Sequence, residues 1–150
     1  MVTKASPAEN ALLYEADFVR WSRRTAELIL ARRWEEIDPE ILADEVGSLA
    51  SSDERRLRQL IGVILKNLLK WYYQPEYRCG KWSSFILEQR FEMEQILEAS
   101  PSLLSKLPKY AESEFEMARE WALIETGVFQ IPETLPYSAE QIVNPEFLPE

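Results

Sequence analysis

The feature that most constrains the fold is a run of apolar residues with helical spacing between Leu57 and Tyr72. They recur at i, i+3, i+4 and i+7, which places them on one side of an α-helix. This segment is predicted to be the central core helix. Pro75 disfavours helical geometry at Gln74, so the helix is expected to end there. The apolar positions are Leu57, Leu60, Ile61, Ile64, Leu65, Leu68, Leu69 and Tyr72.

The residues before this helix also show helical spacing, and no alternating run indicates a strand. A first helix is expected from Ala11 to Arg33. A second is expected to begin with Asp38 as its N-cap and Pro39 at its first position. It either stops before a capping box formed by Ser51 and Glu54 or runs on without a break. The inward positions are predicted to be Tyr14, Phe18, Trp21, Thr25, Leu28 and Ile29, then Ile41, Leu42, Val46 and Leu49.

Two further helices are expected downstream of Pro75. Ser83 or Ser84 is predicted to cap the first of them. Ser100 with Pro101 gives another start signal, and Gly127 is expected to stop the last long helix. The inward positions are predicted to be Phe85, Ile86, Met93, Ile96 and Leu97, then Leu107, Tyr110, Ala111, Ala118, Trp121, Ala122 and Ile124.

The residues after Gly127 contain four prolines, which forbid a long helix and leave room for a turn or two between Ser138 and Val143. This tail is predicted to lie over the helices as an extended strap. The sequence therefore predicts an all-α fold, a helical bundle of four to five helices with a proline-rich C-terminal strap. A single domain is expected over residues 1–150, with an ordered core of about residues 11–127 and the strap at 128–150.

The complete absence of histidine from the chain excludes several kinds of active site. Ser-His-Asp and Cys-His nucleophile systems are impossible, as are zinc sites built on histidine and the Glu-x-x-His di-iron pattern. The four glycines are isolated, so a Gly-rich phosphate loop is not expected either. No catalytic residue and no cofactor is predicted, and a role without catalysis is favoured, while carboxylate-only metal chemistry and lysine-based catalysis stay open.

The single cysteine and the short apolar runs bear on location. Cys79 has no partner for an intramolecular disulfide, which fits a reducing compartment. A redox role for Cys79, between Arg78 and Gly80, has little support because a resolving cysteine is missing. The apolar run from Ile61 to Leu65 is far shorter than the roughly 20 residues that span a bilayer. A cytoplasmic protein without membrane contact is therefore expected.

Charge is unevenly distributed along an acidic chain with a net charge of −9 and a pI near 4.7. Residues 53–81 carry seven basic and three acidic side chains, whereas the segments on both sides are acidic. Clustered basic residues beside aromatic rings suit an anion, nucleic acid or another partner. The alternative is that the arginines face the acidic last helix and that the rings fill the corner between two helices. The candidate surface is Arg55, Arg56, Arg58, Lys66, Arg78 and Lys81.

A few polar residues occupy positions where helical spacing would place apolar ones. Asp17, Glu45, Asn67 and Lys70 are predicted to form an internal polar cluster if the helices bring them together. Asp17 and Glu45 are the candidates for a carboxylate metal site or a small-ligand pocket. The alternative is a structural network in which Asn67 and Lys70 satisfy the two acids. Arg78 and Arg90 are expected to pair with the acidic tail.

Several motifs in the same order resemble a known bacterial family over nearly the whole chain. They are "LYEADFVRW", "LADEVGSLASSDERRLRQLIGVILKNLLKWYYQPEYR", "KWSSFILEQR", "EASPSLL", "ETG" and "PETLPYSAEQIVNPEFLPE". On these motifs the chain is identified as a member of the family called Domain of Unknown Function 29. The resemblance implies an α-helical domain and no established activity. It also implies a histidine at the position that Asn67 occupies in this sequence.

Three classes of function remain. The first is a protein–protein interaction or assembly module, including a homodimer, with Trp34, Phe129 and Phe147 as exposed contacts. The second is a nucleic-acid-linked regulator that uses the basic segment 55–81. The third is a carboxylate-metal enzyme or small-ligand binder around Asp17 and Glu45. The first class is favoured because it requires no chemistry that the composition lacks.

Overall fold

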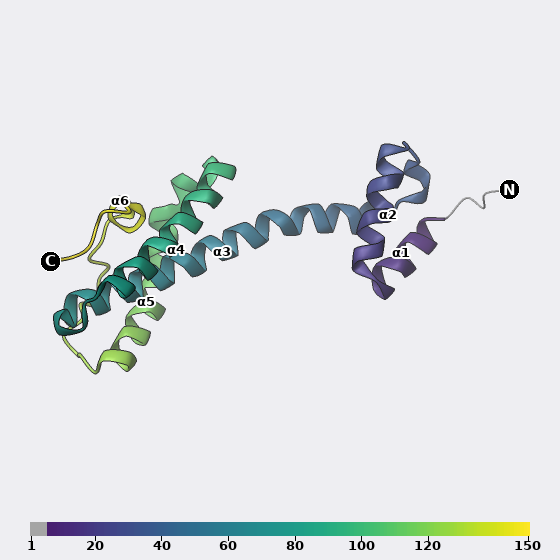
Figure 1. Ribbon diagram of the computed structural model, residues 1–150. Coiled ribbons are helices and arrows are strands. Elements are labelled where there is room, and N and C mark those ends of the chain that lie inside the picture. Colours follow the sequence, from purple (N-terminus) through teal and green to yellow (C-terminus); the bar gives the residue numbers. More distant parts are fainter. Residues whose placement is uncertain (1–5) are drawn as a thin grey trace. The chain divides into compact units, whose positions relative to one another are not determined.

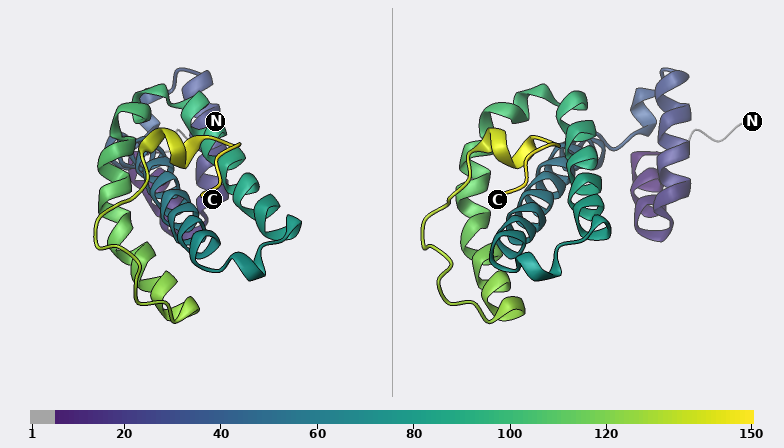
Figure 2. Two further views of the ribbon diagram at one scale, coloured as in Figure 1. Left: turned by 90° about the vertical axis from the view of Figure 1, so that its left-hand side faces the viewer. Right: turned by 60° about the vertical axis from the view of Figure 1, so that its left-hand side comes forward.

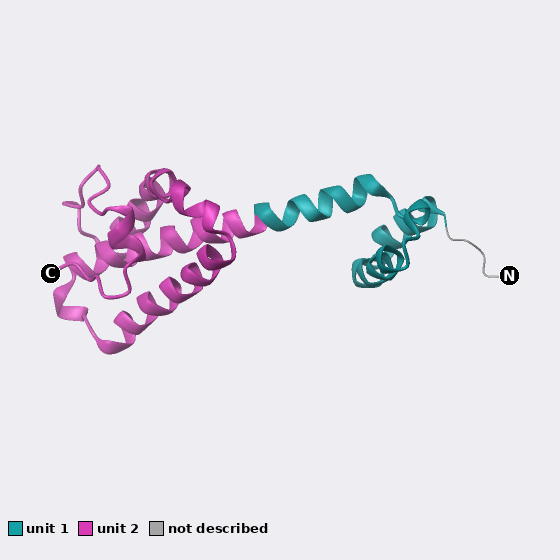
Figure 3. Ribbon diagram, turned by 90° about the horizontal axis from the view of Figure 1, so that it is seen from above, with its two compact units in different colours: residues 1–51 teal, residues 52–150 magenta. Residues whose placement is uncertain are grey.

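The computed structural model describes residues 6–150 of the chain (Figure 1). This range consists of helices and connecting segments without a β-strand, which confirms the predicted all-α helical bundle. The chain divides into two compact units, residues 1–51 and 52–150, and the boundary falls inside helix α3, Pro39–Tyr73 (Figure 3). The single domain expected over residues 1–150 stays a prediction. Within residues 6–150, no helix combines the length and the apolar character needed to cross a bilayer.

The N-terminal unit begins with two helices where the sequence predicted one from Ala11 to Arg33. Helix α1 spans Pro7–Ala16 and helix α2 spans Phe18–Leu30. Between them Asp17 is extended, with φ −159° and ψ 96°, and its carboxylate accepts a hydrogen bond from the backbone N–H of Arg20 at 3.0 Å. The prediction was wrong because an Asp side chain can cap a new helix instead of continuing the old one.

The interior of the N-terminal unit combines apolar and polar side chains. Trp21 and Leu28 of α2 are buried, and so is Glu36 of the short 3₁₀ helix η1, Trp34–Glu36. Asn10 is 4% exposed, accepts a hydrogen bond from the Trp21 indole at 3.1 Å and donates one to the Thr25 hydroxyl at 3.2 Å. This unit is therefore held together by polar contacts as well as by apolar packing.

Helix α3 runs without a break from Pro39 to Tyr73, which confirms the continuous alternative. Asp38 caps it, as predicted, by accepting from the backbone N–H groups of Glu40 and Ile41. Ser51 opens no new helix, since its hydroxyl lies 3.5 Å from the carbonyl oxygen of Gly47, within the same helix. The predicted core positions from Leu57 to Leu69 are buried, whereas Tyr72 is exposed.

In the C-terminal unit, helices α4 (Gly80–Ala99) and α5 (Leu107–Thr126) pack beside the second half of α3 (Figure 2). The 3₁₀ helix η2, Pro75–Tyr77, joins α3 to α4, and η3, Pro101–Lys106, joins α4 to α5. The cap of α4 is Cys79 rather than Ser83 or Ser84, because the chain turns helical directly after the extended Cys79. Gly127 ends α5 in the left-handed conformation with φ 67°, as predicted.

The faces of α4 and α5 differ from the prediction at three large residues. Phe85, Trp121 and Ile124 were expected to point inward, but all three are exposed. In α5 the buried face includes Ala111, Ala118 and Ala122. Small side chains let the helix backbone approach its neighbours closely at these positions, and Trp121 and Ile124 remain on the outer side of α5.

The C-terminal strap lies over α4 and α5 and includes the short helix α6, Ala139–Val143, which Ser138 caps (Figure 2). Ile131 and Ile142 of the strap are buried in the core. Its backbone is also anchored by side chains of the helices: the Tyr73 hydroxyl donates to the carbonyl oxygen of Gln130 at 3.2 Å. The predicted strap is thus a packed part of the C-terminal unit.

Candidate functional site

Arg90 of α4 is the most unusual polar residue of the C-terminal unit, and the sequence patterns did not single it out as a site. It is 3% exposed. Its guanidinium donates to three carbonyl oxygens of the strap, at 2.9 Å to Ile142, 2.7 Å to Phe147 and 3.1 Å to Gln141. Burial lowers the Arg90 pKa to about 10. The expected pairing with acidic side chains of the tail was wrong, because the backbone supplies the acceptors.

Arg119 of α5 and Arg78 also donate hydrogen bonds to backbone carbonyl oxygens. The Arg119 guanidinium donates to the carbonyl oxygens of Ile131 and Pro132, at 3.1 Å and 2.8 Å at closest. Arg78 donates to the carbonyl oxygen of Trp71 at 2.9 Å and lies over the indole of that residue. These arginines therefore have structural roles in chain connections, and Arg78 does not pair with the acidic tail.

The four residues of the predicted polar cluster bind separate partners. Asp17 caps α2, and Glu45 accepts from the Tyr14 hydroxyl at 2.5 Å, a hydrogen bond that raises the Tyr14 pKa. Both lie in the N-terminal unit, whereas Asn67 and Lys70 lie in the C-terminal unit. Asn67 binds Val63 and Trp82, and Lys70 binds Glu125, all within the C-terminal unit, and a cluster of the four residues stays a prediction.

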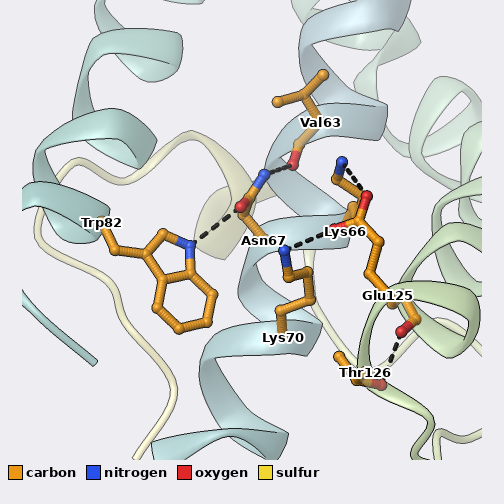
Figure 4. Close-up of polar contacts among 8 residues, drawn as sticks. Val63, Lys66, Asn67, Lys70, Trp82, Glu125 and Thr126 are labelled. Carbon is orange, nitrogen blue, oxygen red and sulfur yellow. Dashed lines mark hydrogen bonds and ion pairs between the residues drawn. The ribbon is translucent and has the colours of Figure 1, made fainter. Parts of the chain in front are cut away.

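Asn67 sits at the contact between α3 and α4 (Figure 4). Its amide donates to the carbonyl oxygen of Val63 at 2.8 Å and accepts from the Trp82 indole at 3.0 Å. The ring of Trp82 stacks edge-on against Trp71, with 5.3 Å between centroids. Trp71 and Trp82 thus fill the corner between the two helices, as the structural alternative predicted, whereas Tyr72 and Tyr77 of the same stretch are exposed.

Replacing Asn67 with leucine is expected to lower the free energy of unfolding by about 1–2 kcal/mol, because the part-buried Trp82 N–H loses its acceptor. Asn67→His is expected to lose less, since a neutral imidazole offers one donor and one acceptor. Urea unfolding followed by tryptophan fluorescence measures both variants. Equal losses for leucine and histidine would contradict a hydrogen-bonding role for this position.

Among the basic residues of α3, only Arg55 lacks an ion pair with the described residues. The hydrogen bond from Arg56 lowers the Glu92 pKa, and that from Lys70 lowers the Glu125 pKa. Partly exposed pairs of this kind contribute little to stability individually, but they neutralise three of the six residues of the predicted anion surface, Arg56, Arg58 and Lys66. The pairs are Arg56–Glu92 (2.6 Å), Arg58–Glu114 (2.6 Å), Lys66–Glu125 (2.9 Å) and Lys70–Glu125 (2.6 Å).

The described residues contain neither an obvious metal cluster nor an unpaired buried polar atom. No group of three or more Cys, Asp and Glu side chains in residues 6–150 is placed to hold a metal ion. Every buried side-chain nitrogen and oxygen in the same range has a hydrogen-bond partner. Cys79 is exposed. The metal site around Asp17 and Glu45 stays a prediction.

The three predicted partner contacts differ in exposure. Trp34 and Phe129 are exposed, as expected. Phe147 is half-buried, and its ring packs edge-on against Tyr137 with 5.9 Å between centroids. Phe147 was wrongly predicted to be exposed because the strap folds back on the core.

The outer side of α5 carries a row of large apolar side chains, two of which, Trp121 and Ile124, had been predicted to lie in the core. Met117 is 60% exposed, Trp121 52% and Ile124 73%. Glu116 and Glu120 lie next to them, are exposed and form no ion pair with the described residues. Together these five side chains are called the α5 face. The three apolar residues recur at i, i+4 and i+7, a spacing that indicates one face of a helix but not whether that face is covered.

A groove of about 480 Å³ runs between α3 and α5 beside the α5 face. Gly62 and Val63 of α3 and Met117 and Trp121 of α5 contribute its apolar lining. Its edge includes Lys66, which is neutralised by its ion pair with an acidic residue of α5. The arrangement offers a shape and an apolar surface for binding another polypeptide.

The fold and these surfaces define a helical protein with an apolar face next to a groove. The chain belongs to the family described as domain of unknown function DUF29, whose sequence pattern matches residues 13–148. Searches among curated proteins and among solved structures gave no match. The family assignment confirms the resemblance found in the sequence.

Proposed function

We propose that this protein is a protein–protein interaction module and that the α5 face is its contact surface. The observation that supports it is the row of Met117, Trp121 and Ile124, each more than half exposed, beside the groove between α3 and α5. Tryptophan is the residue type most often found among the contacts that dominate binding energy. A contiguous exposed apolar row on one helix typically marks an interaction site.

The charges around this row favour a protein partner. Glu116 and Glu120 repel phosphate groups, and Lys66 at the groove is already paired with Glu125. The nucleic-acid hypothesis and the metal hypothesis stay predictions without an observation of comparable strength. A cytoplasmic location, supported by the lone exposed thiol of Cys79, goes with the proposal.

A capture experiment with paired variants tests this function. The double variant Met117→Ser and Trp121→Ser is expected to recover at least about tenfold less of its partner from a native lysate than the unmodified protein does. Phe85→Ser, which changes an exposed aromatic residue of α4, serves as the control and is expected to recover the partner unchanged. Circular dichroism verifies that both variants are folded. Recovery that is identical for all three proteins contradicts the assignment of the α5 face.

A further inference from the structure

The α5 face has a counterpart of opposite charge elsewhere in the same chain. Helix α2 buries Trp21 and Leu28 on one side and leaves Val19 (57% exposed) and Leu30 (85% exposed) on the opposite side, in line with Ala26. Arg20 and Arg23 flank this row. Both are exposed and form no ion pair with residues 6–150. Val19, Ala26, Leu30, Arg20 and Arg23 are called the α2 face.

The two faces match in pattern as well as in charge. On α5 the acidic pair, Glu116 and Glu120, is spaced by about one helical turn, and on α2 the basic pair, Arg20 and Arg23, has nearly the same spacing. In each case the charged pair borders an apolar row that is two to three turns long, roughly the length over which two crossing helices touch. Joining the faces brings opposite charges together and removes both rows from water.

We infer that the α5 face binds the α2 face of a second copy of this chain, so that the protein pairs with itself. The inference rests on the proposed function and names the partner. Each chain carries one acidic and one basic face, which is the pair of surfaces that a two-fold dimer uses when it forms the same contact twice. Two α5 faces do not suit one another, because their glutamates repel.

Charge reversal on each face, measured by light scattering, tests the inference with the full chain. The unmodified protein is expected at twice the 17.6 kDa chain mass. The pair Glu116→Lys and Glu120→Lys, or the pair Arg20→Glu and Arg23→Glu, is expected to weaken association at least about tenfold, because like charges then oppose each other. The control is the pair Glu94→Lys and Glu98→Lys, which are exposed on α4 at the same spacing and are expected to leave the dimer intact.

Mixing the two reversed variants separates pairing between chains from a contact within one chain. In the mixture, lysines on the α5 face of one variant meet glutamates on the α2 face of the other, and the unmodified faces meet as before. The mixture is therefore expected to regain the mass of a dimer. A monomeric unmodified protein, a mixture that stays monomeric, or dissociation by the α4 control overturns the inference.

Failure of self-pairing can be distinguished from failure of the proposed function. If the unmodified chain is monomeric but captures a different protein through Met117 and Trp121, the α5 face is an interaction surface and self-pairing is wrong. If neither pairing nor capture depends on these residues, both statements are wrong. Circular dichroism of each charge variant verifies that the helices are retained.

Discussion

Replacing Arg90 with alanine is expected to lower the free energy of unfolding by about 3 kcal/mol and to release the C-terminal strap. The substitution leaves the carbonyl oxygens of Gln141, Ile142 and Phe147 without their donor, and buried acceptors without a partner cost about 1–3 kcal/mol each. Part of this cost is offset because the buried cation, which has no carboxylate partner, is removed. The net loss is therefore smaller than the sum over three acceptors.

Urea unfolding and limited proteolysis measure the two parts of this expectation. Cleavage within the strap, residues 128–150, should become faster in Arg90→Ala, and Arg90→Lys should be intermediate because an ammonium cannot reproduce the planar guanidinium fork. Arg55→Ala removes an exposed arginine of α3 and should change stability by less than about 0.5 kcal/mol. An Arg90→Ala protein with unchanged stability and an equally resistant strap would contradict the role given to Arg90.

Replacing Asn10 with alanine is expected to destabilise the N-terminal unit by about 2 kcal/mol. The indole N–H of Trp21 loses its acceptor and the Thr25 hydroxyl loses its donor, both in a buried setting. The N-terminal unit is small, so it has few other stabilising contacts that compensate for the loss of these hydrogen bonds. Hydrogen exchange should therefore accelerate about 30-fold in α1 and α2 and remain unchanged in α4 and α5.

The matched control for Asn10→Ala is Ser22→Ala, an exposed position on α2 that should leave exchange unchanged. The measurement is hydrogen exchange followed by mass spectrometry, which resolves the helices separately. If exchange accelerated equally in α4 and α5, the two compact units would unfold together, and the local role of Asn10 would be rejected.

Features set by local contacts were predictable from the sequence. The core face of α3 follows from apolar spacing over many turns, so Leu57 to Leu69 were placed in the core correctly. Asp38 before Pro39 and Gly127 after α5 mark helix ends through the conformations that these residue types favour. The family motifs cover the same helices, and the family implies an α-helical domain, so the predicted fold class and the family assignment are consistent.

Features that depend on tertiary contacts were not predictable. Both Asp17 and Ser51 fit capping signals, yet only Asp17 begins a new helix, while Ser51 lies within α3. Trp121 and Ile124 follow a helical period, but the period does not reveal that alanines occupy the covered side of α5. The acceptors of Arg90 are backbone carbonyls more than fifty residues away in the chain, and no side-chain pattern marks them.

In the candidate functional site, too, some features were predictable from the sequence and others depend on tertiary contacts. Clustered basic residues on α3 were visible in the sequence, but their ion pairs with Glu92, Glu114 and Glu125 arise only when α4 and α5 pack beside α3. Trp34 and Phe129 were named as contacts and are exposed. The α5 face was missed, because exposure of a large apolar row contradicts the usual inward placement of such residues.

Photo-crosslinking in intact cells, with a crosslinkable amino acid at position 121, tests whether the α5 face is an interaction surface. A discrete covalent adduct with a polypeptide is expected at position 121, and a much weaker one from the same probe at position 85, an exposed aromatic position on α4. Adducts of equal pattern at both positions, or none at 121 when the protein is folded and expressed, would contradict an interaction surface on α5.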